Sequence, residues 1–170
     1  MLKLIRMDYS YRRPLEEMME EWHAAGETIV PYSIRRKDYR DFESYLAGFD
    51  EEERGAGGWV PGTTFFGLDT DRDILVGAVN VRRRLNPSLL LDGGHIGDGV
   101  RPSERRKGYA TALIGLALEF CRSIGLGRVL MTCDRENVGS AKSILRNGGV
   151  LENEWEKENG AVVQRYWIEL

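Results

Sequence analysis

The segment spanning residues 97–110 limits the possible folds of this chain more than any other feature. A short strand is expected to end near Val100, because Pro102 prevents the strand from continuing. A turn with three consecutive cations follows at residues 105–107, and a strongly apolar helix begins after Gly108. The first amides of a helix have no internal partners and sit at the positive end of its dipole. This strand–turn–helix unit therefore predicts a binding site for phosphate or pyrophosphate.

A solvated charge cluster on an ordinary turn is the competing interpretation of the same residues, and the placement between a strand and a helix favours the anion site. Two other nucleotide motifs are excluded by their spacing. A dinucleotide fingerprint needs a third glycine where Pro102 stands. No glycine-rich loop ending in Gly-Lys-Ser or Gly-Lys-Thr occurs either, so a P-loop nucleotide site is unsupported.

A known family shares these residues. Residues 100–110, Val-Arg-Pro-Ser-Glu-Arg-Arg-Lys-Gly-Tyr-Ala, resemble the acetyl-CoA signature of the GNAT superfamily of N-acetyltransferases. The later pattern Asn137…Ser140-Ala141…Gly148-Gly149 is similar to that family's second cofactor segment. The sequence around His95 and the end at residues 165–168 resemble a poorly characterised bacterial branch of predicted acetyltransferases.

The resemblance implies a mixed α/β fold with a mostly antiparallel central sheet, flanking helices, and a splayed gap between the fourth and fifth strands. Periodicity and turn residues agree with an alternating order of strands and helices. Strands are expected over residues 2–7, 63–68, 74–82, 95–100, 128–133, 150–155 and 161–170. Helices are expected from Pro14, over 39–49, from Ala110 and from Asn137, with a loop at 86–94. The length of 170 residues predicts one domain over 1–170.

The resemblance also implies acetyl-CoA as co-substrate. The pantetheine arm would pair with the backbone of the fourth strand, and the pyrophosphate would rest on the amides of the following turn. Asn137 would bond the pantetheine, cap its helix, or do both. The residues that the resemblance assigns to the cofactor are Gly97, Asp98, Gly99, Val100, Arg105, Arg106, Lys107, Gly108, Tyr109, Ala110, Thr111, Asn137 and Ser140.

Acetyl transfer to an amine needs a base, an oxyanion donor and an acid for the leaving thiolate. His95 is the first candidate base, since its ordinary pKa is near ~6.5, with a structural role as the alternative. Asp98 is the reserve candidate and lies on the opposite face of a regular strand. The backbone N–H near Val100 is the candidate oxyanion donor. Many GNAT enzymes use a tyrosine on the last helix as the acid, and counting back from Gly149 places Leu145 there.

We therefore expect a cytoplasmic enzyme that acetylates a small amine or a protein amine by direct attack. A non-catalytic acyl-CoA-binding or sensor module is the alternative, and the missing tyrosine favours it. The N-terminal helices and residues 55–58 are expected to shape the acceptor side. The acids at residues 50–53 either attract a cation or form a solvated face. The resemblance makes a homodimer possible.

Composition narrows the remaining classes. With 24 Lys and Arg against 27 Asp and Glu, the net charge of −3 gives no help to non-specific nucleic-acid binding. The aspartates at 69–73 lack the glycine and glutamate of a calcium loop, so no metal is expected. Cys121 and Cys133 are expected to be buried thiols in a reduced compartment. No apolar run is long enough for a membrane span, and no signal peptide is recognisable.

Overall fold

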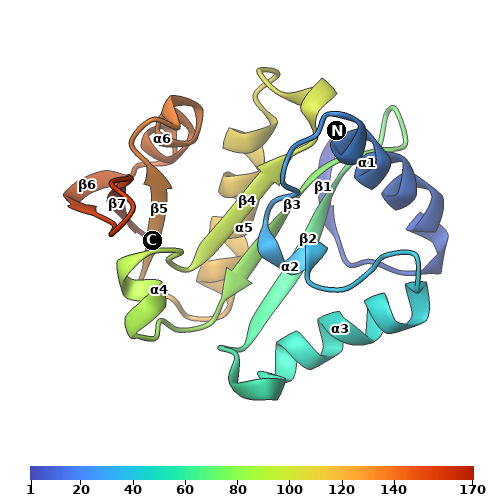
Figure 1. The fold of residues 1–170 in the computed structure, drawn as a ribbon, viewed down its shortest axis with the longest axis horizontal. Coiled ribbons are helices and arrows are strands. Elements are labelled where there is room, and N and C mark those ends of the chain that lie inside the picture. The colour runs from blue at the N-terminus through green and yellow to red at the C-terminus, as the bar shows by residue number, and fades with distance from the viewer.

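Two antiparallel sheets form the centre of the molecule in the computed structural model, which describes residues 1–170 (Figure 1). The first sheet has the order β1-β2-β3-β4, made of β1 (Leu2–Ile5), β2 (Gly62–Asp69), β3 (Ile74–Arg82) and β4 (Ile96–Val100). The second has the order β5-β7-β6, made of β5 (Arg128–Asp134), β6 (Val150–Glu156) and β7 (Val162–Glu169). The predicted mixed α/β fold is confirmed, and the fourth and fifth strands belong to different sheets.

Helices cover both faces of the first sheet. On one side lie α1 (Arg12–Ala24), α2 (Tyr32–Arg35) and α3 (Phe42–Arg54). On the other side α5 (Tyr109–Ser123) packs against β3 and β4, and α6 (Val138–Arg146) packs against α5 and β5. Short 3-10 turns occur at Tyr9–Tyr11, Ala56–Gly58 and Pro102–Glu104.

The segment expected as a loop at 86–94 contains a short helix, α4 (Pro87–Leu91). The Asn86 side chain accepts a hydrogen bond from the Leu89 amide at 2.8 Å and so caps this helix. Pro87 stands at the first helical position, where the missing N–H has no cost. The prediction was wrong because these two local signals were read as turn residues.

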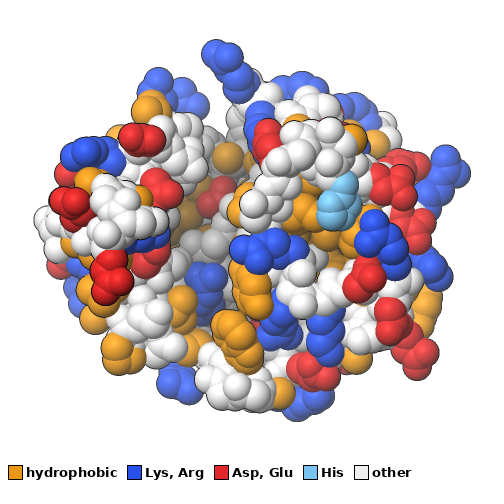
Figure 2. Space-filling view, in the orientation of Figure 1, with side chains coloured by type: hydrophobic (Ala, Val, Ile, Leu, Met, Phe, Trp, Pro, Cys, Tyr) orange, Lys and Arg blue, Asp and Glu red, His pale blue; other side chains and the backbone are white.

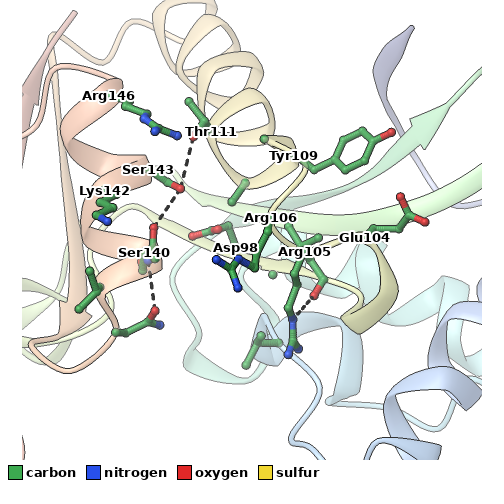
Figure 3. A pocket seen from close by; sticks show the side chains of 18 of the residues that line it. Asp98, Glu104, Arg105, Arg106, Tyr109, Thr111, Ser140, Lys142, Ser143 and Arg146 are labelled. Carbon is green, nitrogen blue, oxygen red and sulfur yellow. Dashed lines mark hydrogen bonds between the residues drawn. The ribbon is translucent and has the colours of Figure 1, made fainter.

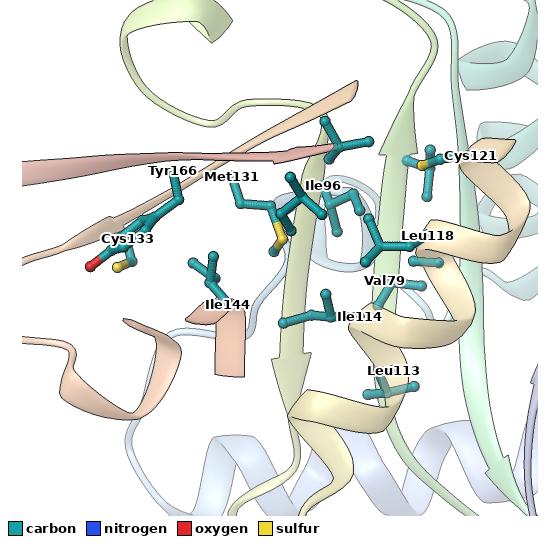
Figure 4. Close-up of a cluster of buried hydrophobic side chains, with 14 of the residues drawn as sticks. Val79, Ile96, Leu113, Ile114, Leu118, Cys121, Met131, Cys133, Ile144 and Tyr166 are labelled. Atoms are coloured by element: carbon teal, nitrogen blue, oxygen red, sulfur yellow. The ribbon is translucent and has the colours of Figure 1, made fainter. Parts of the chain in front are cut away.

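Alternation along β3 sends side chains into two separate cores. Val79 and Val81 join a cluster around α5, which also includes Leu113, Ile114 and other buried residues (Figure 4). Ala78, on the other face, joins the aromatic-rich cluster of α1 and α3. Each face of the first sheet is thereby anchored independently, which fixes β4 as a rigid edge strand beside the gap.

The gap closes at only one end. His95, just before β4, donates its backbone N–H to the Leu130 carbonyl of β5 at 2.7 Å. Beyond this bond no ladder joins the two strands, and β4 pairs only with β3. The free edge of β4 therefore faces the gap from Ile96 to Val100.

Two further expectations concern burial and membranes. Cys121 and Cys133 are both buried and carry free thiols, as predicted. None of the helices has both the length and the apolar character required to cross a membrane.

Candidate functional site

A cavity of about 700 Å³ opens between the end of β4 and the N-terminal ends of α5 and α6. Its walls are residues 98–100, the turn at 104–106, the first turn of α5, and α6 with its Asn137 cap. Glu27, Thr28 and Val30 from the loop after α1 complete the rim. Figure 2 shows the molecule hollowed between the lobe of α6 and β5–β7 and the rest of the chain.

The turn before α5 presents a row of free backbone donors to this cavity. None of the amides of residues 106–111 donates a hydrogen bond within the chain. Arg106 and Gly108 both have positive φ, 63° and 88°, which curls the backbone so that successive N–H groups converge. These donors sit at the positive end of the 15-residue helix α5. The arrangement suits a diphosphate.

Three cations at the cavity have no carboxylate partner within ion-pair distance: Arg106, Lys142 and Arg146. Arg105 is different, because its guanidinium is paired with Glu27 at 3.0 Å. Lys142 and Arg146 are not among the cofactor residues predicted from the sequence. Their spacing of four residues on one face of an amphipathic helix, next to the cofactor segment, was the available signal.

All of the proposed cofactor residues line the cavity except Gly97 and Lys107. Gly97 faces the opposite side of the sheet, where Pro31 and Arg82 lie against it. The Lys107 ammonium is 3.2 Å from Glu104 and is paired with it. For Gly97 and Lys107 the predicted cofactor contact therefore stays a prediction about backbone groups, such as the free amide of Lys107.

Tyr109 contributes its backbone but not its hydroxyl. The phenol donates to Asp69 at 2.7 Å and accepts from Arg72 at 2.7 Å. Figure 3 shows the ring directed away from Asp98 and the cations. The side chain thus ties the start of α5 to the β2–β3 turn, while Tyr109 also lines the cavity.

Asn137 and Ser140 meet at the start of α6. The side-chain oxygen Oδ1 of Asn137 accepts a hydrogen bond from the Ser140 backbone amide at 3.1 Å, which makes Asn137 the N-cap of this helix. Both residues also line the cavity, as Figure 3 shows for Ser140. Thr111 of α5 donates to Ser143 of α6 at 3.4 Å and links the two helices beneath the cavity.

Asp98 is the one unpaired carboxyl at the centre of the site. The regular register of β4 with β3 places it opposite Val79, on the α5 face, and it lines the cavity. It has no ion-pair partner, and burial raises the pKa of its carboxyl to about 6. A carboxyl with that pKa can exchange protons near neutral pH.

His95 occupies a different position from the one expected of a base. Its ring Nδ1 accepts a hydrogen bond from the Leu130 amide at 2.9 Å, and the side chain is absent from the cavity wall. Burial, with Arg82 and Arg128 nearby, lowers the pKa of the imidazole to about 4. We correct the assignment: His95 joins β4 to β5 and its lone pair is occupied by that bond.

This structural role predicts that two variants of His95 differ in stability. His95→Ala leaves the buried Leu130 N–H unpaired and should lower the free energy of unfolding at pH 7 by about 1–3 kcal/mol. His95→Asn, whose side-chain oxygen can accept the same bond, should lose less than half of that. Urea titration measures both. A large fall in acetyl transfer for His95→Asn, with stability retained, would contradict the assignment.

The same histidine predicts a pH effect on stability. Its pKa is lower in the folded chain than the ordinary value of 6.5, so the unfolded chain binds more protons between about pH 4 and 6.5. His95 therefore destabilises the folded chain as pH falls through that window. Subtracting the pH–stability curve of His95→Asn from that of the wild type should reveal this loss, and a flat difference would contradict it.

The backbone of β4 also presents groups to the gap. The bonds Arg101 N–H to Val76 and Arg82 N–H to His95 fix the alternation of the ladder. The N–H groups of Asp98 and Val100 consequently point away from β3, towards the free edge. Leu145, at the position of the expected tyrosine, is 52% exposed and lies outside the cavity wall.

Two of three comparisons with known proteins found similar proteins. The family model described as "Acetyltransferase (GNAT) domain" matches residues 11–150. No curated protein matches the sequence. Solved structures with less than 25% identity to the chain show a shared fold.

One such structure is RimL, a ribosomal L7/L12 alpha-N-protein acetyltransferase solved with coenzyme A, at 16% identity and a TM-score of 0.72. The match covers 99% of this chain and 94% of RimL. The spermidine/spermine N-acetyltransferase SpeG from Vibrio cholerae has 16% identity and a TM-score of 0.64, covering 99% and 95%. The microcin C7 self-immunity acetyltransferase MccE, solved with acetyl-CoA and AMP, has 17% identity and a TM-score of 0.68, covering 99% and 92%.

Proposed function

The chain belongs to the GNAT acetyltransferase family, and from this premise we propose that it transfers an acetyl group from acetyl-CoA to a primary amine by direct attack. One observation carries the proposal. A single cavity joins the free amides of residues 106–111 and three unpaired cations to the unpaired carboxyl of Asp98. Donors and cations suit the phosphates of the co-substrate, and the carboxyl suits proton transfer at its thioester end.

The residues present fit coenzyme A in charge and in space. The amides of the turn would hold the pyrophosphate, with Arg106 adding its unpaired charge. Lys142 and Arg146 of α6 would meet the remaining phosphate. The open edge of β4, with the N–H groups of Asp98 and Val100 directed outward, offers pairing groups for an extended amide-containing arm. Acetyl-CoA supplies the activated thioester.

The chain's own groups divide the remaining work. The Val100 N–H is the proposed donor to the oxygen that gains charge on the carbonyl. Asp98 takes a proton from the attacking nitrogen as the C–N bond forms. It returns that proton to the sulfur as the C–S bond breaks, so the carboxylate is restored after each turnover. This scheme needs neither a tyrosine at Leu145 nor a covalent cysteine intermediate.

The proposal is tested by two measurements on the purified chain. Calorimetric titration should show binding of CoA and much weaker binding of ATP and NAD. Radiolabelled acetyl-CoA with a panel of amines should give a labelled acetylated product. CoA binding without transfer to any amine would instead support an acyl-CoA sensor, and equal binding of ATP would overturn the assignment of the anion site.

A further inference from the structure

A second, smaller cavity of about 170 Å³ lies on the other face of the first sheet. It is bounded by α2, the end of α3, the segment at 58–60 and the start of α4. Figure 1 shows α2 and α3 on this side, opposite α5. The cavity is separate from the one assigned to the co-substrate, and none of the roles given above uses it.

The charged groups in this cavity leave it positive. Arg82 donates from Nη1 to the Gly93 and Gly94 carbonyls, both at 3.0 Å, and has no carboxylate partner. Arg36 donates from Nη2 to the Gly48 carbonyl at 2.8 Å and likewise has no carboxylate partner. Both arginines keep further N–H donors for a ligand, because these bonds use one nitrogen of each guanidinium.

The single acid in the cavity does not neutralise these arginines. Glu52 is buried and accepts hydrogen bonds from the Thr64 hydroxyl at 2.7 Å and from the Asn80 amide at 2.8 Å. No arginine lies within ion-pair distance of it, and burial raises the pKa of its carboxyl, which reduces its negative charge. With two cations and at most one anion, the net charge is positive.

Uncharged groups in the same cavity also suit a polar ligand, and two aromatic rings form its rim. The Ser33 hydroxyl is buried and has no hydrogen-bond partner. Tyr32 and Trp59 stack with ring centroids 5.8 Å apart, and both are partly exposed at 43% and 52%. The Arg36 guanidinium lies 5.8 Å from the Trp59 ring centre. An occupant would meet a free donor inside and an aromatic edge outside.

Arg82, which lines this cavity, also lies close to β4. A Cβ placed on Gly97 would be 3.4 Å from Arg82 Nη2 and 3.4 Å from Pro31, so the unpaired end of Arg82 lies against this strand. Gly97 directly precedes Asp98, whose side chain points to the co-substrate face. Because β4 is an edge strand, a molecule held by Arg82 can extend around its free edge towards Asp98.

The loop after α1 lies beside this path around the edge of β4. A Cβ on Gly99 would be 2.1 Å from the Val30 carbonyl oxygen, so this loop is in direct contact with β4. Val30 also lines the co-substrate cavity. Val30 thus lines the co-substrate cavity and Tyr32, two residues later, lines the second cavity, so this loop runs between the two.

We propose that the second cavity binds an anionic group of the acceptor, so that the substrate class is an amine that also carries a carboxylate or a phosphate. Arg36 and Arg82 bind the anion, Ser33 donates its hydroxyl, and the amine extends along Gly97 to the thioester. This inference rests on the proposed function and specifies its acceptor.

The acidic residues at 50–53 do not support a cationic acceptor instead. Glu51 is paired with Lys37 at 2.9 Å, and Glu53 is paired with Arg6. Glu52 is turned inward, as described above. Of the two alternatives for this run, attraction of a cation is the less supported, because two of the charges are neutralised locally and a third is buried.

The test compares amines of similar length that differ at the far end. The substrates are 4-aminobutyrate, 3-aminopropyl phosphate, butylamine and 1,4-diaminobutane, assayed with acetyl-CoA. A charge-assisted contact predicts at least about tenfold higher kcat/KM for the acid-bearing amines than for the other two. The carboxylate and phosphate arms show which anion is preferred. An equal or better rate with the diamine overturns the inference.

Three variants locate the effect. Arg36→Gln should reduce the preference for acid-bearing amines, measured as the ratio of their kcat/KM to that of butylamine, by about tenfold or more. Arg82→Lys keeps the positive charge but loses the paired N–H donors of the guanidinium, and it should reduce the preference less than Arg36→Gln does. Arg84→Gln is the matched control, since Arg84 is exposed and lies outside both cavities. An unchanged preference in a folded Arg36→Gln variant overturns the inference.

A binding measurement separates this inference from the proposed function. Titration with 4-aminobutyrate should change the tryptophan fluorescence in a saturable way, with Trp59→Phe as the blank and Arg36→Gln as the weakened variant. That result supports the anion site even in a chain that transfers no acetyl group to any amine. Acetyl transfer without a saturable fluorescence change, and without preference for acid-bearing amines, overturns the anion site alone.

Discussion

Asp98→Asn is expected to lower kcat for acetyl transfer by about 10²–10⁴-fold, the range that general acid–base groups contribute. Asparagine has nearly the same shape but cannot accept and return a proton at neutral pH. The proposed phosphate site consists of backbone amides and cations and does not include the Asp98 carboxyl, so CoA affinity should stay within about threefold of the wild-type value, a difference of less than ~1 kcal/mol. Steady-state kinetics and calorimetry measure the two quantities on the same preparation.

The pH profile gives a second readout of the same residue. The pKa of the Asp98 carboxyl is raised to about 6 by burial, so wild-type kcat should rise as pH increases through that value. The rise should be absent from Asp98→Asn. The Cys133 thiol does not produce the same rise, because burial raises its pKa further above this range. A wild-type profile that is flat from pH 5 to 7 would contradict the assignment of the base.

The stability of this variant serves as its folding control. The folded-state pKa of Asp98 lies above its ordinary value of 3.8, so ionisation destabilises the folded chain as pH rises through about 4–6. Asparagine removes that cost. Asp98→Asn should therefore be more stable than the wild type at pH 7, by about 1–3 kcal/mol, and equally stable near pH 3. An inactive and destabilised variant would point to misfolding.

Gly108→Glu is expected to weaken CoA binding by about 10–100-fold, which corresponds to one or two lost charge-assisted contacts. Gly108 stands immediately before α5, and a Cβ at this position meets no atom within 4 Å. The new carboxylate would therefore fit, but it would place a negative charge beside the amides assigned to the pyrophosphate. Calorimetric titration with CoA measures the change.

The control is Gly108→Asn. The backbone of Gly108 has φ of 88°, so both substitutions strain the turn, and asparagine tolerates positive φ better than most residues. Asparagine adds no charge, and its effect on CoA affinity should be several-fold smaller than that of glutamate. If both variants are folded and bind CoA as tightly as the wild type, the pyrophosphate does not lie on this turn.

The strand–turn–helix unit and the α6 cap could be predicted because their signals are local. Pro102, Gly108 and Asn137 each act on the backbone within a few residues, by blocking a strand, permitting positive φ or capping a helix. In the structure, alternation along β3 likewise places Val79 and Ala78 in different cores. Local chemistry of this kind does not depend on which segments meet later.

The partners of individual side chains could not be predicted, because they come from residues far away in the sequence. The Tyr109 hydroxyl is held by Asp69, 40 residues earlier, and Arg105 is neutralised by Glu27, 78 residues earlier. The Nδ1 atom of His95, the candidate base, accepts a hydrogen bond from the Leu130 amide, 35 residues later. Spacing along the sequence does not predict partners this far apart.

By itself, the sequence determined a helix start with free amides beside a strand, because unpaired amides and a flexible glycine are properties of a short segment. Only the tertiary structure decided which ionisable groups face that site, because burial and pairing are set by elements brought together from the whole chain. It left the Asp98 carboxyl unpaired in one cavity and Arg36 and Arg82 without a carboxylate partner in the other.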